Sequence, residues 1–149
     1  MDGKITLSVM TKEDLSFVIS IRNLESTRRY LENKSLFTYE ESMLWFDKYK
    51  PFWFVTYLDN NKIGYFRTLK AGDFLYVGLD LAEEYRGKKL SYPIFQMCLS
   101  YLRELGHQKF CLKVFEENEV AVKLYKKLGF KILSSELVES KNYLYMELV

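Results

Sequence analysis

The sequence of 149 residues has one histidine, two cysteines and no long apolar run, and each scarcity excludes a class of protein. Cys98 and Cys111 form no CxxC spacing and no histidine pair accompanies them, so we expect no metal site. Two isolated cysteines favour buried thiols in a reduced, cytoplasmic protein. No apolar stretch approaches the roughly 20 residues that cross a bilayer. Residues 1–4 lead straight into a predicted strand, so we expect no signal peptide.

Net charge is also small. The sequence holds 22 basic and 20 acidic residues, a formal balance of +2, which is too little to indicate a nucleic-acid partner. Hydrophobic residues make up 48% and charged residues 28%, which predicts a globular chain long enough for one core. No internal repeat, linker or composition shift marks a boundary, so we expect a single domain over residues 1–149.

Apolar periodicity predicts helices and strands over the whole chain. Strands are expected at residues 5–10, 52–58, 63–70, 74–81, 110–114, 130–133 and 143–148. Helices are expected at residues 11–24, 38–50, 89–105 and 118–128, and residues 25–37 form a loop or a short helix. This order predicts an α/β fold with a mixed, mostly antiparallel sheet flanked by about four helices.

The stretch over residues 76–91 is the most informative part of the sequence. It begins with strand-like alternation, continues with the basic turn Arg86-Gly87-Lys88-Lys89, and ends where an apolar helical stripe starts. Free backbone N–H groups and the dipole at a helix start favour an anion, and three cations there are mildly costly without one. The stretch therefore predicts a phosphate site, with a solvated basic surface as the alternative.

Two motifs make this sequence resemble the GCN5-related N-acetyltransferase (GNAT) superfamily. The first is the acyl-CoA diphosphate loop [RQ]-x-x-G-x-[GA] at residues 86–91, with Lys89 where glycine is usual and Ser91 where glycine or alanine is usual. The second is N-x-x-A-x-x-L-Y-x-x-x-G-F at residues 118–130, in which every fixed position matches. The resemblance implies the GNAT fold over nearly the whole chain and acetyl-CoA as co-substrate.

The resemblance also implies roles for single residues. Leu79 and Leu81, near the end of the central strand, are expected to bind the pantetheine arm and offer an amide to the thioester oxyanion. Asn118 is expected to bind the same arm, and it is also a good helix N-cap. Tyr125 matches the general acid that protonates the leaving thiolate, with a core residue as the alternative. The residues expected at the CoA diphosphate are Arg86, Gly87, Lys88, Lys89, Leu90 and Ser91.

The general base stays open. Relatives often carry a glutamate where this sequence has Lys113, so that role cannot be carried over. The remaining candidates are Glu116, Glu117, Asp80 or a water held by Tyr76, and deprotonation through water without a dedicated residue is also open.

The N-terminal half resembles the branch that acetylates ribosomal-protein N-termini, polyamines and amino sugars of nucleotide sugars. Residues 21–23 and 40–45 carry this likeness, with Ser42 in place of the usual histidine. For Arg22 and Arg28, an exposed salt bridge is the alternative to binding a phosphate of the substrate. For Trp45, core packing is the alternative to stacking on the substrate. The residues expected to bind the acceptor are Arg22, Asn23, Arg28, Glu41 and Trp45.

Three functions follow from the resemblance. The favoured one is an acetyl-CoA-dependent N-acetyltransferase that modifies a primary amine of a small molecule, such as a nucleotide-linked amino sugar, by direct attack in a ternary complex. The second is an acetyltransferase of protein N-termini. The third is a non-catalytic acyl-CoA-binding module, which the altered loop and the missing base motivate. We expect a monomer or homodimer with a small-molecule amine as partner, and neither nucleic acid nor membrane.

Overall fold

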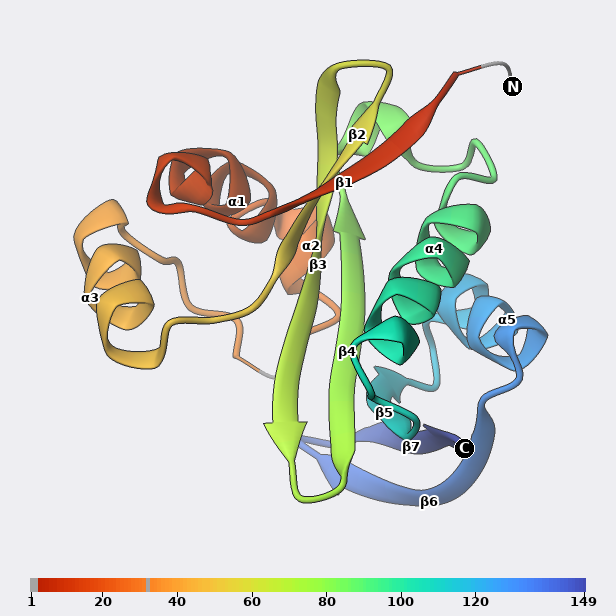
Figure 1. The fold of residues 1–149 in the computed structure, drawn as a ribbon. Coiled ribbons are helices and arrows are strands. Elements are labelled where there is room, and N and C mark those ends of the chain that lie inside the picture. Colours follow the sequence, from red (N-terminus) through yellow and green to blue (C-terminus); the bar gives the residue numbers. More distant parts are fainter. Residues whose placement is uncertain (1–2, 32) are drawn as a thin grey trace. The chain divides into compact units, whose positions relative to one another are not determined.

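The computed structural model describes residues 3–31 and 33–149, and its described strands form one seven-stranded sheet in the order β1-β2-β3-β4-β5-β7-β6 (Figure 1). The pairings β1–β2, β2–β3, β5–β7 and β6–β7 are antiparallel, and β4–β5 is parallel. This arrangement confirms the predicted mixed, mostly antiparallel α/β fold. In chain order the elements are β1 (Ile5–Val9), η1 (Lys12–Asp14), α1 (Leu15–Arg22), α2 (Glu25–Arg28), α3 (Tyr39–Tyr49), β2 (Phe54–Leu58), β3 (Asn61–Ala71), β4 (Phe74–Leu81), η2 (Glu83–Tyr85), α4 (Ser91–Glu104), β5 (Phe110–Phe115), α5 (Glu119–Leu128), β6 (Lys131–Val138) and β7 (Lys141–Leu148).

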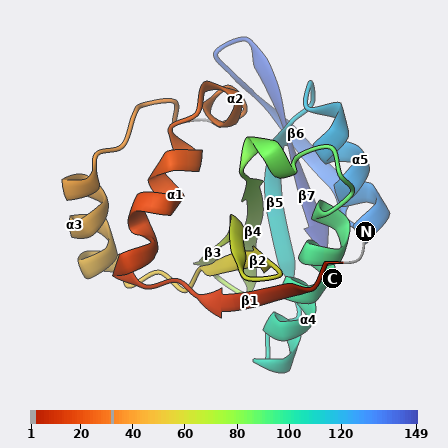
Figure 2. The same ribbon diagram turned by 90° about the horizontal axis from the view of Figure 1, so that it is seen from above.

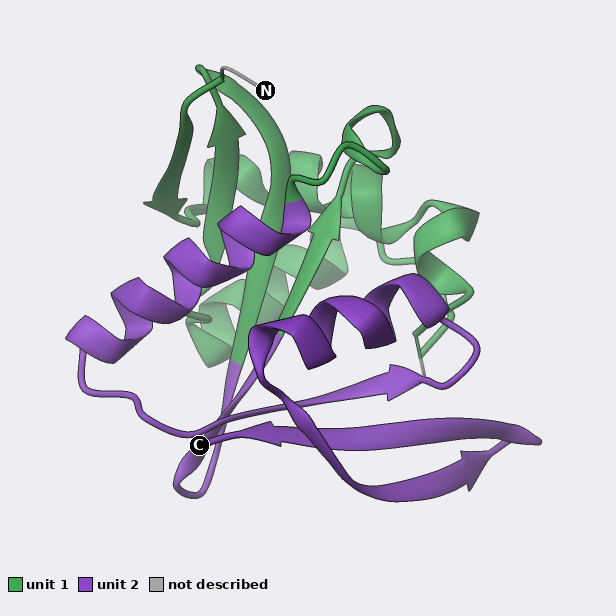
Figure 3. Cartoon of the chain, turned by 90° about the vertical axis from the view of Figure 1, so that its right-hand side faces the viewer, with its two compact units in different colours: residues 1–68, 78–90 green, residues 69–77, 91–149 purple. Residues whose placement is uncertain are grey.

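The chain divides into two compact units, which Figure 3 colours separately. Unit 1 comprises Met1–Thr68 and Gly78–Leu90, and unit 2 comprises Leu69–Val77 and Ser91–Val149. Strands β3 and β4 contribute residues to both units, so neither unit is a single segment of the sequence. A single domain over residues 1–149 stays a prediction.

In unit 1, α1 and α3 lie beside one another (Figures 1 and 2). The chain enters α1 through η1, where Asp14 Oδ2 accepts a hydrogen bond of 2.9 Å from the Thr11 amide. Asp14 also accepts 2.7 Å from Lys62 of β3, which joins the start of the helix to the sheet. Burial opposes ionisation of Asp14, but these hydrogen bonds hold its pKa below the usual value. One cluster of buried residues in unit 1 consists of Met10, Leu15, Val18, Ile21, Val55, Tyr65 and Ala82.

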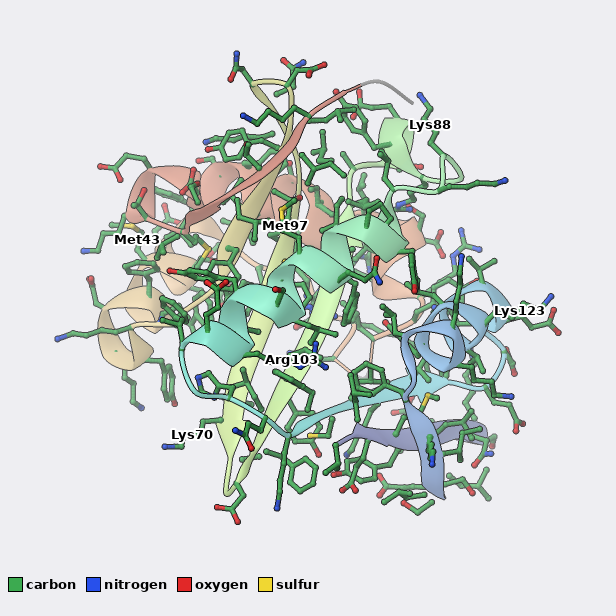
Figure 4. All side chains as sticks on the ribbon, turned by 45° about the vertical axis from the view of Figure 1, so that its right-hand side comes forward. Met43, Lys70, Lys88, Met97, Arg103 and Lys123 are labelled. Carbon is green, nitrogen blue, oxygen red and sulfur yellow. The ribbon has the colours of Figure 1, made fainter. Side chains whose placement is uncertain are left out.

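In unit 2, α4 and α5 lie beside one another (Figure 1). Phe95 of α4 is fully buried, and its ring meets the edges of Tyr125 and Phe130 at centroid distances of 5.7 and 6.2 Å. Gly129 ends α5 in the left-handed conformation with φ 104°, as a helix C-terminus prefers. Met97 on α4 and Lys123 on α5 mark the exposed sides of the two helices (Figure 4).

The boundaries of α4, β6 and β7 are among those that differ from the sequence prediction. Helix α4 begins at Ser91, not near Lys89, because Lys89 has the left-handed φ of 61° and cannot continue into a right-handed helix. By contrast, residues 25–37 were predicted as a loop or a short helix, and the single helical turn α2 agrees with that prediction. Strand β6 extends to Val138, well beyond residue 133, and β7 begins at Lys141. Strand β6 lies at the sheet edge and is exposed along most of its length, so it lacks the apolar alternation that reveals a strand. No helix among the described residues is long and apolar enough to cross a membrane.

Candidate functional site

The loop over residues 86–90 follows β4 and η2 in unit 1 and leads directly to the start of α4. Gly87 and Lys89 have positive φ values of 70° and 61°. Within the described chain, the amides of residues 87–90 donate to no backbone carbonyl. The side chains of Lys88 (labelled in Figure 4) and Lys89 are exposed on this loop. Left-handed residues beside unpaired amides are typical of turns that bind anions, and two lysines add positive charge.

Arg86 fastens this loop to two other parts of unit 1. Its Nε donates 3.0 Å to the carbonyl of Leu81 at the end of β4. Its Nη1 and Nη2 donate 2.7 and 2.8 Å to the hydroxyls of Ser26 and Thr27 on α2. The resemblance places Arg86 at the diphosphate. The structure adds an anchoring role that no local pattern indicated, since the two hydroxyl partners lie about 60 residues earlier in the chain.

Replacing Lys89 with glycine is expected to stabilise the protein by up to about 1 kcal/mol, because a left-handed lysine is strained and a left-handed glycine is not. Thermal unfolding checks this. Lys88→Gly is the matched control, since Lys88 lacks a positive φ, and glycine there is expected to lower stability. If both variants lower the melting temperature equally, the loop carries no strain at Lys89. A CoA titration of the same variants shows whether the Lys89 ammonium contributes to binding.

Strand β4 carries the two leucines that the resemblance assigned to the pantetheine arm. Its parallel pairing with β5 joins Leu75 to Phe110 and Tyr76 to Cys111. Leu79 and Leu81 lie farther along β4, in unit 1. At Gly64 on β3, an added Cβ would lie 2.4 Å from the Asp80 carbonyl oxygen, so glycine is required for the close approach of the two strands.

Asn118 and Tyr125 lie on α5 and its N-cap, in unit 2. The Asn118 side-chain oxygen accepts 3.4 Å from the Ala121 amide, so this residue caps the helix. Tyr125 is half-buried, and its ring packs edge-on against Phe95 and Phe130 at 5.7 and 6.0 Å. This packing fixes the orientation of the Tyr125 ring. The general-acid role stays a prediction.

Unit 1 contains a cavity of about 480 Å³ that the sequence did not reveal. Three of the predicted acceptor residues, Arg22, Glu41 and Trp45, line it. Asp80 also lines it, so among the base candidates this carboxylate lies at the cavity. The full lining is Leu15, Val18, Ile19, Arg22, Leu31, Asn33, Phe37, Glu41, Ser42, Trp45, Trp53, Tyr65, Arg67 and Asp80.

The other two predicted acceptor residues hold the loop over residues 33–37. The Asn23 side chain both donates to and accepts from the backbone of Phe37, at 2.8 Å each. Arg28 donates to the carbonyls of Asn23 and Lys34 at 3.0 and 3.1 Å. Neither residue is among the described residues that line the cavity.

A polar cluster on β3 and β4 lines the same cavity. Arg67 Nε lies 3.2 Å from Asp80 Oδ2. Tyr65 is fully buried, and burial, together with the nearby negative charge of Asp80, raises its pKa well above the usual value. Tyr65 and Arg67 were not predicted as site residues, because strand alternation alone does not indicate which side chains face a cavity.

The family model described as acetyltransferase (GNAT) family matches residues 18–130. The chain belongs to the GNAT acetyltransferase family. This membership confirms the superfamily resemblance, while the specific branch stays a prediction. The family match covers both the loop after β4 and the whole motif at residues 118–130.

Curated relatives match over shorter segments. A mycothiol acetyltransferase of Corynebacterium aurimucosum is 39% identical over 71 residues, which is 48% of this chain and 23% of the relative. The uncharacterized N-acetyltransferase YdgE of Bacillus subtilis is 42% identical over 57 residues, covering 38% of this chain and 36% of the relative. The matched segments thus cover well under half of the full length of each of these relatives.

Solved structures match over nearly the whole chain. A spermidine N-acetyltransferase from Vibrio cholerae, in complex with CoA and spermine, has a TM-score of 0.89 at 21% identity, covering 97% of this chain and 94% of that one. YncA from Salmonella typhimurium, a putative acetyltransferase with its cofactor acetyl-CoA, has a TM-score of 0.79 at 14% identity, covering 97% and 92%. At these identities the likeness shows the fold.

Proposed function

We propose that this protein is an acetyl-CoA-dependent N-acetyltransferase that acts on a primary amine of a small molecule. The loop over residues 86–90 is the observation that carries the proposal, because its amides and lysines fit a diphosphate. A Cβ built at Gly87 meets no atom within 4 Å, so the backbone there is open to a ligand. Hydrogen bonds from Arg86 hold this loop against β4 and α2.

When bound, acetyl-CoA supplies the activated acetyl thioester. The backbone of Leu79 and Leu81 then offers N–H groups to the pantetheine arm and to the oxygen on which negative charge develops. The resemblance also gives Asn118, the N-cap of α5, a role in binding pantetheine. Tyr125 donates a proton to the leaving sulfur. The acceptor amine must lose a proton before it attacks, and Asp80 is the base candidate that the cavity supports.

The cavity of unit 1 is the acceptor site in this proposal. Its volume of about 480 Å³ suits a small molecule, which favours that class over a polypeptide chain. The relatives named for mycothiol and spermidine acetylation support the same choice. A nucleotide-linked amino sugar is a finer candidate, supported by Arg22 in the cavity lining. The second cation expected for its diphosphate, Arg28, donates instead to backbone carbonyls.

Release of free CoA thiol from acetyl-CoA, measured against a panel of amines, tests the proposal. The panel comprises amino acids, amino sugars, a nucleotide-linked amino sugar, polyamines and peptides with free N-termini. We expect turnover with at least one small amine and little with peptides. Turnover with peptides alone would favour the protein N-terminal acetyltransferase. Measured CoA binding without turnover on any amine would favour the non-catalytic binding module.

A further inference from the structure

Two polar atoms in the cavity of unit 1 are buried without a hydrogen bond. Among the described residues, neither the Tyr65 hydroxyl nor Asp80 Oδ2 makes a hydrogen bond of good geometry, although the two side chains lie close to each other and Asp80 is ion-paired with Arg67. Tyr65 is 0% exposed, and both residues line the cavity. Because buried polar groups are nearly always hydrogen-bonded, these two atoms indicate a ligand group that donates to Asp80 and bonds to the Tyr65 hydroxyl. An amine has that chemistry.

Arg22 brings a buried positive charge to the same cavity. It is 9% exposed, and it donates to the carbonyls of Asn33 and Ser35 at 2.5 and 3.4 Å. Its guanidinium lies 4.2 Å from the ring centre of Phe37. In the described part of the chain, no carboxylate lies within ion-pair distance of Arg22. A buried charge is costly unless an opposite charge meets it, so Arg22 indicates an anionic group on the ligand.

Apolar and aromatic side chains form the walls between these polar groups. Trp53 stacks parallel to Tyr65 at 5.7 Å, and Trp45 meets Trp53 edge-on at 4.9 Å. Leu15 and Val18 of α1 line the same cavity. Such walls favour a ligand with an apolar or flat aromatic body.

We propose that the acceptor is an amino-acid-type molecule, with one amine and one carboxylate on an apolar or aromatic body. This inference rests on the proposed function and names the substrate class of its acceptor site. The amine binds Asp80 Oδ2 and the Tyr65 hydroxyl, the carboxylate binds Arg22, and the body packs on the two tryptophans. A polyamine brings additional positive charge beside Arg22 and Arg67, which is unfavourable. A diphosphate carries more negative charge than the single guanidinium of Arg22 balances, so a diphosphate-linked acceptor is also disfavoured.

The two tryptophans of the sequence both line this cavity, so their fluorescence reports ligand binding directly. The full chain is titrated, with and without CoA, with phenylalanine, phenethylamine, 3-phenylpropionate, spermidine and a nucleotide-linked amino sugar. Phenylalanine and phenethylamine share one body and differ in the carboxylate. We expect phenylalanine to bind about tenfold more tightly than phenethylamine or phenylpropionate, the size of effect that one charged contact gives. Phenethylamine, spermidine or the nucleotide sugar binding as tightly as phenylalanine overturns the proposal.

Arg22→Gln and Arg28→Gln form a matched pair, because both arginines hold the loop over residues 33–37 and only Arg22 lines the cavity. We expect Arg22→Gln to abolish the preference for phenylalanine over phenethylamine, and Arg28→Gln to retain it. Equal loss in both variants assigns the preference to the loop and overturns the role of the Arg22 charge.

Tyr65→Phe keeps the ring and removes the hydroxyl, so it tests the amine contact even where Arg22→Gln fails to fold. This variant is expected to bind phenylalanine and phenethylamine about tenfold more weakly, and its affinity for phenylpropionate is expected not to change. Equally weaker binding of all three ligands contradicts the amine contact.

Release of CoA thiol separates the proposed enzyme activity from the proposed ligand class. Tight phenylalanine binding without acetylation of any amine overturns the enzyme and leaves the ligand class. Turnover of amines that lack a carboxylate, with weak phenylalanine binding, overturns the ligand class alone.

Discussion

Tyr125→Phe is expected to lower kcat for acetyl transfer by about 100-fold or more, the range that a positioned proton donor supplies. The substitution keeps the ring that packs against Phe95 and Phe130 and removes only the hydroxyl. The free energy of unfolding is therefore expected to change little. Steady-state thiol release with the best amine of the panel, measured over a range of pH, checks the prediction. The alkaline fall in kcat that reports the acid is expected to disappear in the variant.

Tyr101→Phe is the matched control, because Tyr101 lies on α4 of the same unit and is 38% exposed. It is expected to leave kcat and its pH profile unchanged. If Tyr125→Phe retains the parent kcat at every pH, the general acid is another group. If it lowers kcat and the melting temperature together, the tyrosine acts through packing.

Arg86→Ala is expected to lower the free energy of unfolding by about 2–4 kcal/mol and to raise the KM for acetyl-CoA by about tenfold or more. The change removes three charge-assisted hydrogen bonds, to the Leu81 carbonyl and to the Ser26 and Thr27 hydroxyls. The loop over residues 86–90 then loses its attachment to β4 and α2, and its amides lose their fixed direction. Chemical unfolding and CoA titration measure the two effects.

A second variant separates anchoring of the loop from direct contact with CoA. Ser26→Ala with Thr27→Val removes the hydroxyl acceptors on α2 and leaves the Arg86 charge in place. If Arg86 acts by anchoring, the double variant weakens CoA binding in the same direction as Arg86→Ala. Arg86→Lys is not expected to restore binding, because an ammonium cannot reach three acceptors in fork geometry. Unchanged stability and CoA affinity in Arg86→Ala would contradict the anchoring role.

Local pattern predicted most of the helices and strands. Capping at Thr38 and Glu41 marked the start of α3, and Gly129 marked the end of α5, because these signals act within a few residues. Pattern predicted only the first part of β6, because the exposed edge position of this strand imposes no alternation of apolar residues. It also failed at Lys89, since a positive φ in a lysine is set by the loop and not by the residue's own preference.

The sequence by itself determined the family, the order of elements and the two motifs, because spacing along the chain encodes them. Only the tertiary structure decided what the arginines do. Arg86 meets partners about 60 residues away, and Arg22 is buried beside a cavity where an exposed salt bridge was the alternative. Such partners come from segments that are distant in the sequence and that only the fold brings together. Local pattern also does not encode burial, which determines how much free energy an unpaired charge costs.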